Sequence, residues 1–207
     1  ATLDVEASHF VRCASGGSGG AVRARESNDF FLPLQAAVRL ANCSLEACSA
    51  RGAGGGVSIT GGALAVVNSY FVRGRAATVG GAISCEDGSM DVELVWLVEN
   101  EASGLGGGAL YTQRCEASLH NLSALGNAAL SGGGGVLLWQ GSQQPTVRGW
   151  QRGLCGAGPA QFQCPAGFAG PGGFDCEACA AGTFKAHEGA GECEPCPPNS
   201  DALPAAP

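Results

Sequence analysis

Aromatic and charged residues are scarce in this sequence. They make up 6% and 14% of the 207 residues, whereas glycine occurs 35 times. A conventional core built around large rings is therefore not expected, because aromatic side chains supply much of the area that such a core buries. A narrow tube filled by valine, leucine, isoleucine and alanine is compatible with this composition.

Positive charge and long apolar runs are also scarce. Eleven basic residues stand against 18 acidic ones, so the net charge is −7 and no basic patch is available for nucleic acid or an anionic membrane. No apolar run approaches the roughly 18 residues of a spanning helix. The chain also begins in a strand pattern at Leu3 rather than in a secretory leader. We expect no nucleic-acid partner, no membrane insertion by this segment, and more chain around it.

Cysteine, by contrast, is abundant. Eleven cysteines far exceed the usage of cytosolic proteins and predict an oxidising compartment, outside the cell or at its surface. The odd number implies that at least one cysteine is free or pairs outside this segment.

Paired glycines recur along the first 140 residues. The second glycines of the pairs are 36, 25, 27 and 27 residues apart: Gly20, Gly56, Gly81, Gly108 and Gly135. Upstream of each pair, an aromatic or apolar residue precedes a Cys, Gly or Asn by three positions, as in Phe10/Cys13, Leu45/Cys48, Phe71/Gly74, Leu97/Asn100 and Ala124/Asn127. A fixed period in this range is typical of a solenoid.

Each repeat also contains a strand with apolar residues at alternate positions, such as Val38 and Leu40 or Leu64 and Val66. This alternation indicates a strand with one buried face. We therefore predict an all-β fold: a right-handed parallel β-helix of five to six coils over residues 1–150, followed by a small disulfide-rich module over residues 151–207. Glycine at a fixed corner suits this fold, because it adopts positive φ without strain.

The repeat resembles that of a known family. Gly80-Gly81-Ala82-Ile83 preceded by Phe71-x-x-Gly74, and Gly107 to Leu110 preceded by Leu97-x-x-Asn100, resemble the GGAI and FxxN repeat of chlamydial polymorphic outer-membrane proteins. The resemblance covers about residues 1–140 and implies a β-helical adhesin. Cysteine or glycine often replaces the family's asparagine, so the resemblance supports the fold more than an autotransporter role.

The long first interval reflects an insertion over residues 26–35. It carries four large apolar side chains, Phe30, Phe31, Leu32 and Leu34, which are unlike those of a solvated loop. The insertion either caps the tube, as solenoids require, or docks a partner. These four residues are the candidate partner contacts.

Two disulfides are expected within the coils. Cys13 and Cys48 share a column in adjacent coils, which brings them within disulfide reach. A Cys43–Cys48 bond is the alternative. Cys85 and Cys115 follow the glycine pairs of the third and fourth coils, and we expect them to pair.

Asn42, Asn68 and Asn121 share another column, in phase with the buried alternate positions. Asn42-Cys43-Ser44 and Asn121-Leu122-Ser123 are glycosylation sequons. If these side chains point inward, they form a hydrogen-bonded ladder, which the sequon-free Asn68 favours. If the column is a corner where the chain turns outward, Asn42 and Asn121 can carry glycan.

Beyond Gln140 the pattern becomes one of cysteines, at Cys155, Cys164, Cys176, Cys179, Cys193 and Cys196. The segment from Cys176 to Ser200 looks like the cysteine-rich module of ephrin receptors and of many eukaryotic surface proteins. It has too few apolar residues for a core, so cross-links must hold it together. The paired CxxC spacing also fits a zinc ribbon. Thiolate sites are poorly maintained in an oxidising compartment, however, and we expect no metal and no cofactor.

An active site is not expected, although many β-helices act on polysaccharides. Asp4 and Asp91 share an outward column but lie three coils apart, about 14 Å by the strand spacing. Glycosidase carboxylate pairs need roughly 5 to 9.5 Å.

We therefore expect a non-enzymatic structural or adhesive segment of a larger cell-surface or filament-forming glycoprotein. Its partners would be other protein chains or other domains of the same chain, with glycans as a further possibility. The combination of coils, cysteine module and composition resembles the mastigoneme glycoproteins of green algae. The alternative function is a carbohydrate-binding or carbohydrate-active β-helix protein.

Overall fold

The structure is a computed structural model. It describes residues 1–26, 36–104, 106–131, 135–140, 145–148, 168–169, 177–180, 182–184 and 192–196. The chain forms two compact units, Ala1–Pro159 and Ala160–Pro207. The candidate contact residues Phe30, Phe31, Leu32 and Leu34 lie outside the described residues.

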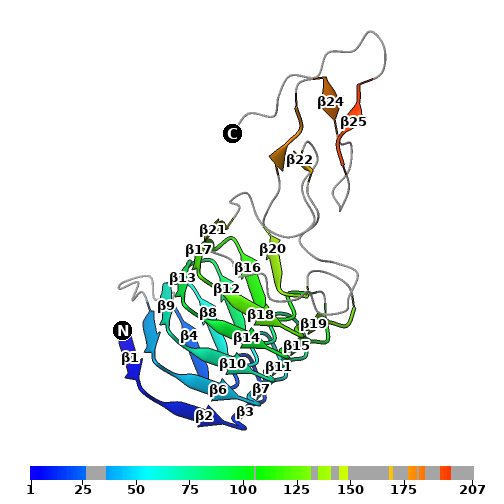
Figure 1. The fold of residues 1–207 in the computed structure, drawn as a ribbon. Helices are drawn as coiled ribbons and strands as arrows, with labels where there is room; N and C mark the ends of the chain where they lie inside the picture. The colour runs from blue at the N-terminus through cyan, green and yellow to red at the C-terminus, as the bar shows by residue number, and fades with distance from the viewer. Residues whose placement is uncertain are drawn as a thin grey trace. The chain divides into compact units, whose positions relative to one another are not determined.

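The first unit is a parallel β-solenoid whose coils follow one another from the N-terminus (Figure 1). Sheet A contains β1 (Thr2–Glu6), β5 (Ala37–Ala41), β9 (Ala63–Val67), β13 (Ser89–Glu93), β17 (Glu116–His120) and β21 (Thr146–Arg148). Sheet B contains β2 (His9–Val11), β6 (Ser44–Glu46), β10 (Tyr70–Val72), β14 (Trp96–Val98) and β18 (Ser123–Leu125). The predicted parallel β-helix is confirmed.

Two more sheets complete each coil. Sheet C contains β3 (Ala14–Ser15), β7 (Ser49–Ala50), β11 (Arg75–Ala76), β15 (Glu101–Ala102) and β19 (Ala128–Ala129). Sheet D contains β4 (Val22–Arg25), β8 (Val57–Thr60), β12 (Ile83–Glu86), β16 (Leu110–Gln113) and β20 (Leu137–Gln140). Each strand pairs with its equivalent one coil away, so equivalent positions of successive coils stack along the tube.

The interior consists of these stacked apolar positions. Leu40, Val66, Val92 and Leu119 form one fully buried ladder under sheet A. Phe71 lies in register with Leu45 and Leu97 under sheet B, as the sequence columns predict. The tube is therefore filled mainly by aliphatic side chains, which agrees with the low aromatic content.

Sharp corners separate the four sheets, and residues at these corners have left-handed backbone conformations. The corner between sheets A and B is formed by Ala7, Asn42, Asn68, Leu94 and Asn121, with φ between 46° and 54°. The corner before sheet D carries the glycine pairs. Gly80 has a φ of 64°, and a Cβ on Gly81 would lie 2.1 Å from the carbonyl oxygen of Gly108. The first glycine thus supplies the turn and the second permits close stacking of coils.

Sheet D differs from the others because both of its faces are covered. Ser58, Ser84 and Tyr111 point away from the tube yet are buried. Ala53, Val79 and Tyr111 form a small apolar cluster, against which Leu138 packs. The middle of the outer face of sheet D is therefore not accessible.

The described residues of the second unit form two short antiparallel pairs. β22 (Phe168–Ala169) pairs with β23 (Glu177–Ala178), and β24 (Thr183–Phe184) pairs with β25 (Glu194–Pro195). A disulfide joins Cys179 to Cys193. Among the residues that the structure describes, no helix has the length and apolar character needed to cross a membrane.

Candidate interaction surfaces

The N-terminal face of the solenoid consists of four strand edges. β1, β2, β3 and β4 are each the terminal strand of their sheet in the described structure (Figure 1). Among the described residues the apolar ladder is less covered at this edge: Leu3 is 44% exposed, whereas its register partner Val38 is 4% exposed. Edge strands with apolar ladders are surfaces on which further strands can pair.

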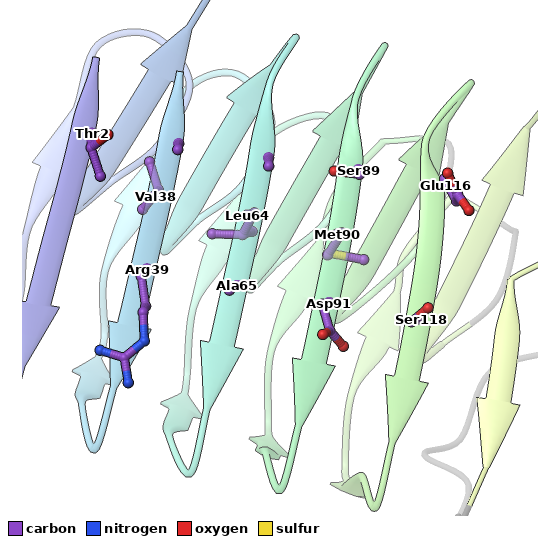
Figure 2. Close-up of a pocket in the computed structure, with 12 residues that line it drawn as sticks. Thr2, Val38, Arg39, Leu64, Ala65, Ser89, Met90, Asp91, Glu116 and Ser118 are labelled. Atoms are coloured by element: carbon purple, nitrogen blue, oxygen red, sulfur yellow. The ribbon is translucent and has the colours of Figure 1, made fainter. Parts of the chain in front are cut away.

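A shallow groove crosses the outer face of sheet A, with a volume of about 330 Å³ (Figure 2). Small outward side chains on the central strands, including Ala63, Ala65 and Ser89, leave this space open. Asp91 and Glu116 border the groove from neighbouring strands. They occupy diagonal positions of the ladder, because Asp91 is in register with Ser118. Glu116 is not among the carboxylates that the sequence analysis considers, although the repeat places it on the same outward face, two positions before the column of Asp91.

An exposed aromatic pair lies on the outer face of sheet B. The rings of Tyr70 and Trp96 are stacked, with centroids 4.5 Å apart and planes inclined by 10°. Tyr70 is 44% exposed. The pair was missed at the sequence level, although both residues immediately precede the buried column that contains Phe71 and Leu97. Outward positions next to a buried column stack as faithfully as inward ones.

The asparagine column of the sequons faces outward. Asn42, Asn68 and Asn121 are all exposed at the corner between sheets A and B. The favoured interpretation, an inward ladder, is therefore wrong. A surface hydrogen bond replaces part of it, since Asn68 Nδ2 donates to Asn42 Oδ1 at 2.7 Å. The positive φ of the corner residue turns the chain at this point. Its side chain therefore points outward, although counting alternate positions along the preceding strand would place it inside.

The buried asparagine ladder lies one corner further on, at Asn100 and Asn127, which are 0% and 1% exposed. Asn100 Oδ1 accepts from the Gly74 N–H at 2.9 Å, and Asn100 Nδ2 donates to Phe71 O and Asn127 Oδ1, each at 2.9 Å. Asn127 Oδ1 also accepts the Asn100 N–H, and Asn127 Nδ2 donates to Leu97 O. These bonds tie three successive coils together.

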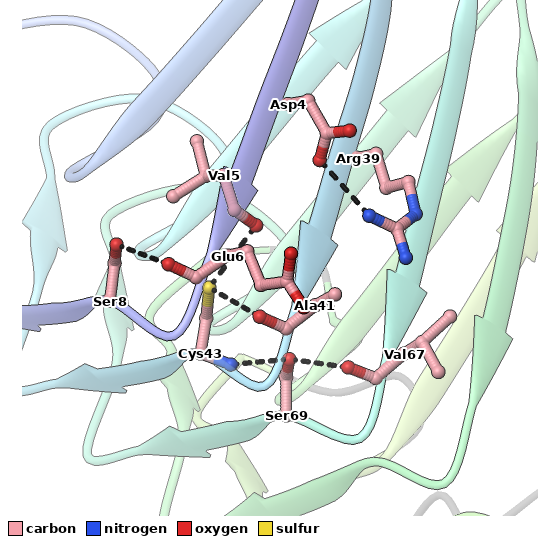
Figure 3. A network of polar contacts seen from close by, with 9 residues as sticks. All are labelled: Asp4, Val5, Glu6, Ser8, Arg39, Ala41, Cys43, Val67 and Ser69. Carbon is pink, nitrogen blue, oxygen red and sulfur yellow. Dashed lines mark hydrogen bonds and ion pairs between the residues drawn. The ribbon is translucent and has the colours of Figure 1, made fainter.

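Polar side chains also support the corner between sheets A and B. The residue after the corner donates to the carbonyl two positions earlier in three coils: Ser8 to Glu6, Cys43 to Ala41 and Ser69 to Val67 (Figure 3). Ser69 Oγ additionally accepts the N–H of Cys43 at 3.0 Å. Outside the tube, Asp4 and Arg39 form an exposed ion pair at 3.1 Å.

The described cysteines of the solenoid divide into one disulfide and three thiols. Cys85 and Cys115 are bonded, with their Cα atoms 6.0 Å apart. Cys13, Cys43 and Cys48 are free, so neither the expected Cys13–Cys48 bond nor its Cys43–Cys48 alternative is made in this structure. Burial is the main reason why the pKa of the Cys48 thiol rises to about 11, and the nearby Cys13 thiol adds to the effect.

The remaining cysteines lie beyond residue 150 of the sequence. Cys196 is a free thiol, whereas Cys155, Cys164 and Cys176 lie outside the described residues. The Cys179–Cys193 disulfide takes up two of the four thiolates that a zinc ribbon would need. The cysteine pattern therefore acts as a covalent staple in this structure.

The comparisons with known proteins concern this second unit. Residues 167–202 match a family model. It is described as tyrosine-protein kinase ephrin type A/B receptor-like. No curated protein and no solved structure matched the chain significantly. The ephrin-receptor-like module and the β-solenoid fit an extracellular protein-interaction segment, and the disulfides suggest an oxidising extracellular compartment.

Proposed function

We propose that this chain is a non-enzymatic structural and adhesive segment of a larger surface or filament glycoprotein and that it works by protein–protein assembly. The solenoid supplies a rigid rod and the cysteine-rich module supplies a covalently held joint. The extracellular setting is supported by the match to the ephrin-receptor-like module and by the disulfides Cys85–Cys115 and Cys179–Cys193. A mastigoneme-like filament is the specific assembly that the repeat and composition favour.

The N-terminal edge of the solenoid supports this proposal, because Leu3 on this edge is 44% exposed in the described structure. A partner coil placed on β1 to β4 would continue four parallel sheets at once and cover the exposed Leu3. Its strands would pair with the free edges about 4.8 Å away, and its apolar residues would extend the internal ladders. The partner is therefore a further β-coil, from a neighbouring protein chain or from another domain of the same long chain.

The one carboxylate pair compared from the sequence, Asp4 and Asp91, does not have a glycosidase spacing. In sheet A, β5 and β9 separate β1 from β13, so Asp4 and Asp91 are about 14 Å apart. Asp4 is also paired with Arg39.

A second candidate function, carbohydrate binding, is favoured by the groove on sheet A with Asp91 and Glu116 on its border. Binding or turnover of acidic polysaccharides with and without Ca²⁺ tests it. If an acidic polysaccharide binds saturably and Asp91→Asn abolishes this binding, carbohydrate binding becomes the preferred function in place of assembly.

The assembly proposal is tested by sedimentation velocity on the full, oxidised chain. We expect concentration-dependent association that Leu3→Lys weakens, because the substitution places a charge in the ladder that a partner coil would bury. Glu6→Lys is the matched control, since Glu6 lies on the same strand and is exposed outside that ladder. Circular dichroism should be the same for both variants. A chain that stays monomeric throughout, or that associates equally in both variants, would refute the assignment of this face.

A further inference from the structure

The two glycosylation sequons lie on either side of the exposed aromatic pair. Along the outer face of sheet B, register places Ser44, Tyr70, Trp96 and Ser123 on consecutive strands. Ser44 is the third residue of the first sequon, and Ser123 is the third residue of the second. Sequons that are 79 residues apart by their numbers, 42 and 121, are thus brought to the two ends of one aromatic stack.

Both sequon asparagines are oriented for modification. Asn42 and Asn121 are exposed corner residues with φ of 54° and 50°. Asn42 uses Oδ1 to accept the hydrogen bond from Asn68. Within the described residues its Nδ2, the atom to which an N-linked sugar is bonded, makes no hydrogen bond.

The aromatic stack leaves one face of each ring uncovered by its partner. Tyr70 and Trp96 face each other at 4.5 Å, so the second face of Tyr70 turns toward the strand of Ser44 and that of Trp96 toward the strand of Ser123. A serine side chain is too short to cover a ring. Aromatic faces carry partial negative charge and attract the polarised C–H groups of a sugar ring.

We propose that Asn42 and Asn121 carry N-linked glycans and that the innermost sugar of each packs on the neighbouring free ring face, on Tyr70 and on Trp96 respectively. Each asparagine is two residues, about 7 Å, from its serine along the chain, and the serine is about 4.8 Å from the adjacent strand. The first sugar on the side chain can therefore reach the ring. This inference rests on the proposed function, because the modification requires the secretory pathway.

The modification is a balanced group transfer. A bond forms between Asn Nδ2 and C1 of the first sugar, while the bond from C1 to a diphosphate oxygen of a lipid-linked oligosaccharide breaks. Nδ2 loses one proton, and the lipid diphosphate leaves. Glycans placed in this way would cover the outer face of sheet B, including the exposed Leu125, and would leave the N-terminal face as the surface for assembly.

Glycan occupancy is tested on the full chain secreted from a eukaryotic cell. Enzymatic release of N-glycans converts a modified asparagine to aspartate, which peptide mass mapping detects. We expect conversion at Asn42 and Asn121 but not at Asn68, which shares their column without a sequon. Ser44→Ala and Ser123→Ala should each remove one glycan and keep its asparagine.

Packing on the rings is tested by NMR of the glycosylated chain. The acetyl methyl groups of the innermost sugars should show ring-current shifts. Trp96→Leu should abolish the shift at Asn121, and Tyr70→Leu that at Asn42, while Val98→Ser, an outward substitution without a ring, should leave both shifts unchanged.

The outcomes separate this inference from the proposed function. Secretion with the Cys85–Cys115 bond formed but with Asn42 and Asn121 unmodified would overturn the inference and leave the function standing. Modification without ring-dependent shifts would overturn the packing. Retention inside the cell with Cys85 and Cys115 reduced would overturn both.

Discussion

Replacing Asn100 by leucine tests whether the buried asparagine ladder holds the coils together. Leucine has a similar volume but cannot accept the Gly74 N–H, which is buried. Leaving such a group without an acceptor costs about 1–3 kcal/mol, and each hydrogen bond donated by Asn100 Nδ2 contributes about 1 kcal/mol more. New apolar contacts of leucine recover part of this loss. We expect the free energy of unfolding to fall by about 3 kcal/mol.

Urea unfolding of the full, oxidised chain, followed by circular dichroism, measures this loss. Asn68→Gly is the matched control: it removes an exposed asparagine hydrogen bond, and glycine keeps the left-handed corner at φ 46° without strain. The control should stay within about 0.5 kcal/mol of the parent, as surface changes usually do. Equal effects in both variants, or a stabilising Asn100→Leu, would show that water or local adjustment satisfies the Gly74 N–H and would refute the reasoning.

Three further predictions concern corners, charge and thiols. Gly81→Val should unfold the solenoid, because the Cβ of valine would lie 2.1 Å from a backbone oxygen. Gly16→Ala should leave the fold unchanged, because nothing lies within 4 Å of its Cβ. Circular dichroism measures the β content of both variants. The hydrogen bond from Arg114 lowers the pKa of Asp87. The ion pair therefore stabilises the folded state above about pH 4, and this contribution is lost as the pH falls through the lowered pKa of Asp87. In Asp87→Asn, the free energy of unfolding measured by urea titration should consequently fall less between about pH 5 and acidic pH than in the parent. Alkylation of Cys48 at pH 8 should be slow because its thiol is buried with a pKa of about 11, and rapid labelling would contradict this burial.

The repeat in the sequence determined the coil architecture and the register of sheets A to C. At sheet D the second coil differs by one residue from the predicted alignment, because Gly55 rather than Gly56 lies in the column of Gly20 and Gly81. Phe71 stacks on Leu45 and under Leu97 as the glycine-anchored columns predict, because each strand buries alternate side chains and a one-residue slip would expose all of them. Covalent structure was partly readable for the same reason: the Cys85–Cys115 bond links equivalent regions of neighbouring coils. The resemblance of the C-terminal cysteines to an ephrin-receptor module likewise depended on local spacing alone.

Only the tertiary structure decided which polar residues face the tube. Asn42 continues the alternation of Val38 and Leu40, so counting along the strand places it inside. Its φ of 54° turns the chain at that residue and directs the side chain outward. Asn100, by contrast, follows the left-handed residue Glu99 and points inward. There its side-chain amide forms hydrogen bonds with the Gly74 N–H and the Phe71 carbonyl of the adjacent coil. A period-2 pattern ends at each corner, and the direction of the next side chain depends on backbone dihedral angles that no alternation records.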